Sequence, residues 1–234
     1  MSTFRFKQFT IHQEKAQMKV GTDSIILGSV IKIKSKYKRI LDVGTGTGLL
    51  SLMIAQKSSN PDITAVEIDS NAYHQAKINI DKCKWRNRIN LIHADAKQLE
   101  IDNKYDLIIC NPPYFSKSKQ SIITSKNTAR HQVELTFKDL LNIWDKIGND
   151  DSDLACIIPI IESEKLYKMV INHGNYLSYY LEVRSNPNSN PKRAVMLFSK
   201  NKMETIKSEL CIHNNKGGYS EAYINMTKDF YLNH

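Results

Sequence analysis

The feature that most constrains the fold is a run in which glycine alternates with threonine, Gly44-Thr45-Gly46-Thr47-Gly48. The apolar segment 39–43 precedes it and the apolar segment 49–56 follows it. A buried strand, a glycine turn and a helix in this order are typical of the opening unit of a doubly wound α/β sheet. Glycine lets the backbone approach a ligand closely, and the helix N-terminus adds N–H donors and positive potential. The run therefore predicts a ligand site at the end of the first core strand.

The glycine spacing and the acid before it narrow the choice of ligand. G-x-G-x-G differs from the dinucleotide pattern G-x-G-x-x-G, and the Gly-Lys-Ser/Thr of a phosphate-binding loop is missing. Asp42 stands just before the turn, where a carboxylate would repel phosphate. It suits a cationic ligand instead. S-adenosylmethionine carries a sulfonium and an ammonium group and no phosphate, so we expect it as the cofactor.

Two further predicted strands, 62–69 and 89–96, also end near an acid. Glu67 follows the glycine turn by about 20 residues, the usual position of a carboxylate that binds ribose hydroxyls. Asp95 is a candidate acceptor for an adenine amino group. A single strand-end aspartate is usually a turn or cap residue. The three acids together, Asp42, Glu67 and Asp95, favour a nucleoside site much more specifically.

Asn111-Pro112-Pro113-Tyr114 follows the apolar run 105–110, which predicts a fourth strand. The prolines lack an N–H and cannot extend a sheet ladder, so they fix a stiff turn. The Asn111 side chain and the Pro112 carbonyl then form a pair of acceptors that fits a planar NH₂ group, and Tyr114 offers a face for a flat ring. The four residues predict a catalytic site for methyl transfer to an exocyclic or amide NH₂, above all N6 of adenine.

The remaining pattern predicts one α/β domain. A strand is expected over 4–11 and a helix over 24–33, with Thr22 or Asp23 as its N-cap. Later helices are expected at 70–83, 135–147 and 162–173, later strands at 153–159, 177–183 and 194–198, and a terminal helix in 219–232. The fold class is therefore a Rossmann-like, doubly wound, mostly parallel sheet with a terminal antiparallel strand. Within a single domain over 1–234 we expect a cofactor-covering segment (1–38), a catalytic core (39–200) and a C-terminal extension packed on the core (201–234).

Charge and composition favour a nucleic-acid partner. The 234 residues carry a formal net charge of +9, which suits a polyanion, although an AT-biased genome would also give many lysines. The segment after Tyr114 is basic and is either an RNA contact or a solvated loop. Candidate RNA contacts are Lys117, Lys119, Lys126, Arg130, Lys192 and Arg193.

Other classes of protein are disfavoured. No apolar run approaches the roughly 20 residues of a membrane span, and the N-terminus lacks an apolar signal core, so we expect a cytoplasmic protein that does not enter a membrane. The four cysteines contain no C-x-x-C pair and the histidines show no ligand spacing, so neither a metal site nor a disulfide is expected. The oligomeric state is not predicted, and a monomer is assumed.

The chain resembles the class I S-adenosylmethionine-dependent methyltransferases, and most closely the bacterial family that methylates N6 of the adenine 3′ of the anticodon in valine tRNA. The resemblance covers nearly the whole chain. It rests on Phe6–Phe9, Met18–Asp23, Asp42–Gly48, Val66-Glu67, Asp95, Asn111–Tyr114 and Ala129-Arg130.

The resemblance implies tRNA as partner and a role for each matching residue. Lys19, Val20 and Gly21 would line the cofactor pocket near the methyl group, although the segment alone suggests only a turn and a cap. The full implied cofactor set is Lys19, Val20, Gly21, Thr22, Asp42, Gly44, Gly46, Gly48, Glu67, Ile68, Asp95, Ala96 and Asn111.

Several alternative functions share the Asn-Pro-Pro-Tyr motif. A glutamine of a release factor or ribosomal protein also offers a planar NH₂, but such enzymes carry a larger N-terminal domain than the roughly 40 residues here. Guanine N2 of ribosomal RNA is a second alternative, and DNA adenine would need a recognition domain. A non-enzymatic RNA-binding protein is the alternative from another class.

Overall fold

The protein is described by a computed structural model over residues 3–14, 16, 19–100, 103–112 and 135–232. The strands are β1 (Thr3–Arg5), β2 (Thr10–His12), β3 (Arg39–Val43), β4 (Asp62–Glu67), β5 (Ile89–His93), β6 (Tyr105–Cys110), β7 (Gly148–Pro159), β8 (Tyr176–Arg184), β9 (Arg193–Ser199) and β10 (Ile206–Cys211). The helices are α1 (Thr22–Val30), α2 (Leu49–Lys57), α3 (Ser70–Asp81), α5 (Phe137–Ile147), α6 (Ile160–Asn172) and α7 (Glu221–Thr227), with 3₁₀ turns η1 (Arg86–Arg88) and η2 (Ala96–Gln98).

The centre of the molecule is an eight-stranded sheet in the order β10-β8-β9-β7-β6-β3-β4-β5. Every neighbouring pair is parallel except the two pairs of β9, which runs antiparallel to both β7 and β8. The predicted fold class, a doubly wound and mostly parallel sheet with an antiparallel strand toward its end, is confirmed. Two more strands, β8 and β10, continue the sheet beyond β9.

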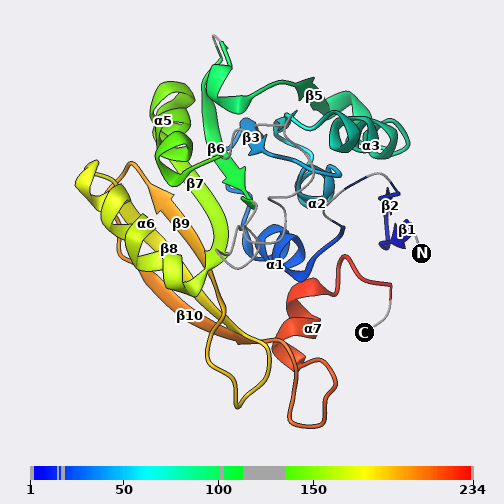
Figure 1. The fold of residues 1–234 in the computed structure, drawn as a ribbon, viewed down its shortest axis with the longest axis vertical. Helices are drawn as coiled ribbons and strands as arrows, with labels where there is room; N and C mark the ends of the chain where they lie inside the picture. The colour runs from blue at the N-terminus through cyan, green and yellow to red at the C-terminus, as the bar shows by residue number, and fades with distance from the viewer. Residues whose placement is uncertain (1–2, 15, 17–18, 101–102, 113–134, 233–234) are drawn as a thin grey trace, which may run out of the picture.

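Alternating side chains of the buried strands build a core on each face of the sheet. Ile40 belongs to the core that includes residues of α1, α2, α3 and α7, whereas its neighbour Leu41 belongs to the core with α5 and α6. Figure 1 shows α5 and α6 on one side of the sheet and α1 and α2 on the other. Strands buried on both faces appear in a sequence as continuous apolar runs, so these strands could be predicted from the sequence. Trp144 of α5 is fully buried in the second of these cores.

Two local predictions are wrong, and one strand was not predicted. Segment 4–11 is not one strand but a hairpin, in which β1 pairs antiparallel with β2 because Phe6 and Phe9 in the turn bury against each other with ring centroids 4.6 Å apart. The N-cap of α1 is Gly21 without a side-chain cap, since Thr22 and Asp23 are already helical. Strand β10 was not predicted, because its exposed edge position leaves it mostly polar.

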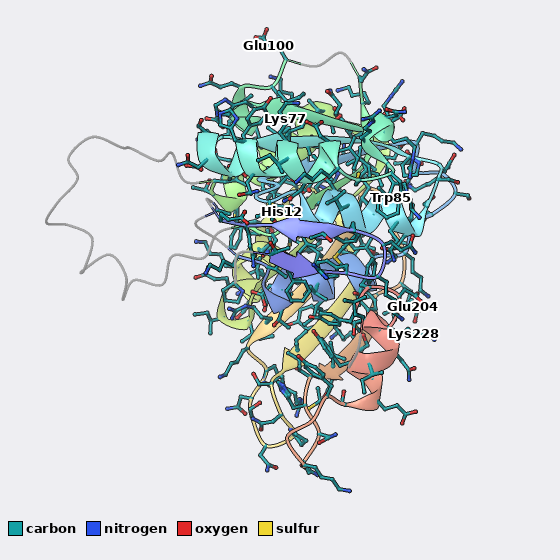
Figure 2. All side chains as sticks on the ribbon, turned by 90° about the vertical axis from the view of Figure 1, so that its right-hand side faces the viewer. His12, Lys77, Trp85, Glu100, Glu204 and Lys228 are labelled. Carbon is teal, nitrogen blue, oxygen red and sulfur yellow. The ribbon has the colours of Figure 1, made fainter. Side chains whose placement is uncertain are left out.

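The N-terminal hairpin joins the start of the chain to its end. The backbone N–H of Lys7 donates to the carbonyl of Phe230 (2.8 Å), and Phe6 forms an isolated bridge with Tyr231. On its other side the hairpin is held to α3, because Asn79 exchanges two hydrogen bonds with the backbone of His12. Figure 2 shows this arrangement, with His12 on the hairpin and Lys228 just after α7. The predicted terminal helix that packs back on the fold is thereby confirmed as α7.

Within the ranges that the structure describes, none of the helices combines the length and apolar character needed to cross a membrane.

Candidate functional site at the carboxyl edge of the sheet

The strand register brings the predicted site residues to one edge of the sheet. Val43 of β3 pairs with Val66 of β4 on one side and with Cys110 of β6 on the other. The next residues along these three strands, Gly44, Glu67 and Asn111, therefore lie side by side where the strands end. Ligands of doubly wound sheets bind at this carboxyl edge.

The glycine turn presents open backbone to this edge. Gly44 and Gly46 adopt φ values of +69° and +61°, which only glycine adopts readily, and a Cβ at either position would meet no other heavy atom within 4 Å. Gly48 differs, since a Cβ there would lie 3.6 Å from Ala76 and Ile80 of α3. The first two glycines thus leave space for a ligand, while at Gly48 a Cβ would make only ordinary contacts and the φ of +83° is what favours glycine.

Asp42 is fully buried beneath the turn with one oxygen satisfied. Its Oδ2 accepts hydrogen bonds from the hydroxyls of Thr45 (2.6 Å) and Ser51 (2.7 Å), whereas Oδ1 has no hydrogen-bond partner among the described residues. Burial raises the pKa of Asp42 to about 6, against the lowering effect of the two hydroxyls. A buried carboxylate with an unsatisfied oxygen is a favourable neighbour for a cation.

Glu67 closes β4 and braces the glycine turn. Its Oε2 accepts from the backbone N–H of Gly46 and its Oε1 from that of Asp69, both at 2.8 Å. Burial raises the pKa of Glu67, and these backbone donors act in the opposite direction. Asp69 in turn caps α3 by accepting from the N–H of Ala72. Ile68 between them is 47 % exposed and offers an apolar surface next to the carboxylate.

Asp95 lies just beyond β5, which is the neighbour of β4. The backbone N–H of Ala94 donates to the carbonyl of Glu67 (3.1 Å), which ties this turn to the same edge. Asp95 is the N-cap of η2 and accepts from the N–H of Lys97 at 3.0 Å. Both Asp95 and Ala96 are half-buried. Asp95, the third strand-end acid, therefore lies at the same edge of the sheet as Glu67, and it also caps η2.

Asn111 is oriented by a residue that the sequence analysis missed. Its side-chain nitrogen Nδ2 donates to the hydroxyl of Ser24 in α1 across 2.8 Å. Asn111 is half-buried and Pro112 is buried. In the sequence, Ser24 is marked only by its position directly after Met18–Asp23, a segment that carries part of the family resemblance.

Segment 19–23 leads into α1 at this edge. The N–H of Val20 donates to the side chain of Gln13 (2.7 Å), and Lys19, Gly21 and Thr22 are exposed. Asp23 accepts a hydrogen bond from Nε of Arg193 at 2.8 Å, which joins the start of α1 to the start of β9.

The predicted RNA contacts differ in their surroundings. Arg193 takes part in the ion pair with Asp23, whereas its neighbour Lys192 is exposed. Six predicted site residues fall outside the described residues: Pro113, Tyr114, Lys117, Lys119, Lys126 and Arg130.

The site fits S-adenosylmethionine on its own chemistry. The unsatisfied oxygen of Asp42 suits a cation, the open backbone of the glycine turn admits a close ligand, and Glu67 with Ile68 combines an acceptor with an apolar surface. Next to them stands Asn111, an amide at the end of β6. Fold and site together define a Rossmann-like class I methyltransferase that uses S-adenosylmethionine.

Comparison with known proteins gives the particular family. Residues 15–135 match the family model described as the methyltransferase small domain. A tRNA1(Val) (adenine(37)-N6)-methyltransferase of Pseudoalteromonas translucida is 38% identical over 99% of both chains, and one of Trichodesmium erythraeum is 39% identical over 98% of this chain and 97% of its own. The chain belongs to this family of methyltransferases.

A solved structure supports the fold. The crystal structure of a predicted O-methyltransferase from Agrobacterium tumefaciens superposes with a TM-score of 0.69 at 15% identity, and the match covers 89% of this chain and 96% of that one. The topology is therefore shared over nearly the whole molecule despite little sequence identity.

Proposed function

We propose that the protein transfers the methyl group of S-adenosylmethionine to N6 of adenine 37 in a valine tRNA. The observation that carries the proposal is that relatives of this name match the chain from end to end, at 38–39% identity. The predicted single domain, with its core at 39–200 flanked by segments 1–38 and 201–234, agrees with such matches.

The cofactor would be held by the acids and glycines of the carboxyl edge. Asp42, with the open backbone of Gly44 and Gly46, would receive the positively charged methionine end. Glu67 would bind the ribose hydroxyls, since each of its oxygens retains a lone pair beyond its backbone hydrogen bond. Ile68, Asp95 and Ala96 would contact the adenine, and segment 19–22 together with Gly48 and Asn111 would complete the predicted set. When bound, the cofactor supplies an electrophilic methyl group on sulfur.

Asn111 and Pro112 would prepare the target nitrogen for attack. The Asn111 oxygen and the Pro112 carbonyl would accept the two N6 hydrogens, which makes the nitrogen lone pair available and stabilises the positive charge that develops there. The N6–C bond forms as the C–S bond breaks, and the nitrogen then loses a proton to solvent. Pro113 would stiffen the turn and Tyr114 would stack on the base. Positioning supplies much of the remaining acceleration.

The RNA would reach this edge through positive charge. A net charge of +9 favours a polyanion, and the exposed Lys192 is a suitable phosphate contact beside the start of β9. Lys117, Lys119, Lys126, Arg130 and Arg193 stay predicted contacts. A base in an anticodon loop is less costly to unstack than one within a duplex, which suits a single small domain. A cytoplasmic, monomeric enzyme is the corresponding expectation.

The test is transfer of labelled methyl from S-adenosylmethionine to purified valine tRNA, followed by nucleoside analysis. We expect N6-methyladenosine in the wild-type transcript and no label when adenine 37 is replaced by guanine. Asn111→Ala should abolish transfer while it leaves binding of S-adenosylhomocysteine within about twofold. Label in a release factor or in ribosomal RNA, and none in tRNA, would overturn the proposed substrate.

A further inference from the structure

We infer that Ser24 is a positioning residue that sets the orientation of the Asn111 amide, and that the Asp23–Arg193 ion pair holds helix α1 where Ser24 can do so. The inference rests on the proposed function, because it concerns the group that receives the target NH₂. It also gives Arg193 a role in positioning helix α1, whereas its charge alone suggested an RNA contact.

An asparagine amide is nearly symmetric in shape but opposite in chemistry on its two sides. One side is an oxygen that accepts hydrogen bonds, and the other is an NH₂ that donates them. To receive an amino group, Asn111 must present its oxygen. A half-turn of the amide would place its own NH₂ against the NH₂ of the substrate, and two donors cannot bond.

In the structure the Ser24 hydroxyl holds the amide in the first of these two orientations. It accepts from Nδ2 of Asn111 at 2.8 Å, so the amide nitrogen faces α1 and the oxygen lies on the other side of the Cβ–Cγ bond axis. Both side chains are half-buried. In such a setting a hydrogen bond restricts rotation more than it would in water.

Helix α1 is itself fixed at both ends and along its middle. At its start, Nε of Arg193 donates to Asp23 at 2.8 Å, with both side chains largely shielded from solvent. At its end, the ammonium of Lys57 donates to the carbonyls of Gly28, Ser29 and Ile31.

The middle of α1 packs tightly against α2. A Cβ on Gly28 would lie only 2.7 Å from the sulfur of Met53, so the two helices approach closely at this glycine. Ser24 is thus carried on a rigid support. The ion pair at Asp23, one residue before Ser24, is the part of that support nearest to the site.

The first experiment compares two serines of the same helix. In Ser24→Ala we expect kcat for tRNA methylation to fall about tenfold, with the KM for tRNA, the affinity for S-adenosylhomocysteine and the Tm nearly unchanged. Ser24→Thr keeps a hydroxyl and should recover most of the rate. The matched control is Ser29→Ala, because the Ser29 hydroxyl is buried without a hydrogen-bond partner among the described residues and should leave kcat unchanged.

A second measurement follows hydrogen exchange at the Asn111 side-chain amide. In protein labelled with ¹⁵N-asparagine, the Asn111 side-chain NH₂ should exchange with solvent more slowly than the exposed Asn215 side chain, and Ser24→Ala should remove that difference. Unchanged kcat and unchanged exchange in Ser24→Ala would overturn the inference. This readout needs no tRNA, so it separates failure of the inference from failure of the proposed function, in which the wild type would not label tRNA.

The third experiment distinguishes positioning from RNA contact at Arg193. If the ion pair positions α1, then Arg193→Met and Asp23→Asn should both lower kcat, by about threefold, with little change in KM. If Arg193 only binds phosphate, Arg193→Met should raise the KM for tRNA and reduce its salt dependence, while Asp23→Asn should not lower kcat; that result would overturn this part of the inference. Lys192→Met is the comparison, because Lys192 is exposed, has no ion pair within the part of the chain that the structure describes, and should act through KM alone.

Discussion

Glu67 accepts a hydrogen bond from the backbone N–H of Gly46, so that the acid at the end of β4 braces the glycine turn that follows β3. Its second oxygen accepts from Asp69. A glutamine in place of Glu67 has only one oxygen, and its NH₂ would face one of these two N–H groups. We therefore expect Glu67→Gln to lower the free energy of unfolding by about 1–3 kcal/mol even without cofactor, measured by urea denaturation.

Weaker cofactor binding should accompany that loss, because the proposed ribose acceptor is changed as well. The control is Glu182→Gln in β8, since this side chain lies far along the sheet from the glycine turn. If Glu67→Gln kept full stability and reduced affinity only, the bracing role would be wrong.

Asp42 makes cofactor affinity depend on pH. Its pKa is raised to about 6 by burial, so the carboxyl loses its negative charge as the pH falls below that value. Affinity for S-adenosylmethionine should be level above about pH 7 and should fall toward pH 5. Isothermal titration across this range measures it, and Asp42→Asn should bind more weakly with a flat profile over the same interval.

The stability of the free protein should run the other way. The pKa of Asp42 rises from 3.8 in the unfolded chain to about 6 in the folded protein, so the folded state binds the proton more tightly. The stabilisation is fully present below about pH 4 and is lost as the pH rises through 6. Asp42→Asn should therefore flatten this part of the stability profile. A wild-type profile whose slope matches that of Asp42→Asn would contradict the burial effect.

The glycine turn can be tested with a pair of matched substitutions. Gly46 and Gly174 both adopt positive φ values, +61° and +78°, and both have open space around the Cβ position. Alanine at either should cost about 1–2 kcal/mol of stability from backbone strain. Only Gly46→Ala should weaken binding of S-adenosylhomocysteine, by tenfold or more, because Gly174 ends α6 away from the site. Equal effects on binding would show that strain, not space, is responsible.

An ion pair away from the glycine turn, with a buried aspartate and a partly exposed lysine, should affect stability alone. Asp153 is fully buried, and its Oδ2 accepts from Nζ of Lys34 (2.6 Å) and from the hydroxyl of Tyr37. Asp153→Asn should destabilise the fold by about 1–3 kcal/mol, because an amide replaces the carboxylate that accepts from Lys34 and Tyr37 in a buried position. The affinity of the folded protein for the cofactor should not change. Asp151→Asn is the comparison: the pair of Asp151 with Lys36 is exposed, and its loss should cost less than about 1 kcal/mol.

The sequence was sufficient to predict strands and site residues where the local hydrophobic pattern agrees with the burial of the side chains. Buried parallel strands read as apolar runs, and residues at their carboxyl ends must meet at one edge, so Asp42, Glu67 and Asn111 could be brought together without a structure. The glycine turn could also be predicted, because a positive φ at Gly44 and Gly46 is a local property.

Contacts between distant segments could not be predicted. Ser24 and Asn111 are separated by 87 positions, and serine is common enough that nothing marks it as a partner. Arg193 was assigned by its charge, although its neighbour in space is Asp23. Alternation over 4–11 fits one strand or two, and only the burial of Phe6 against Phe9 decides for a hairpin.

The contact between the N-terminal hairpin and the end of the chain joins Lys7 to the carbonyl of Lys228, 221 positions away. A loop of that size costs more entropy to close than any short one, so this contact is expected to form late in folding. During synthesis the hairpin emerges long before residues 228–231, which leaves Phe6 without its contact to Tyr231 until that segment has been made. A circular permutant that links residues 1 and 234 and opens the chain elsewhere would turn these distant contacts into local ones.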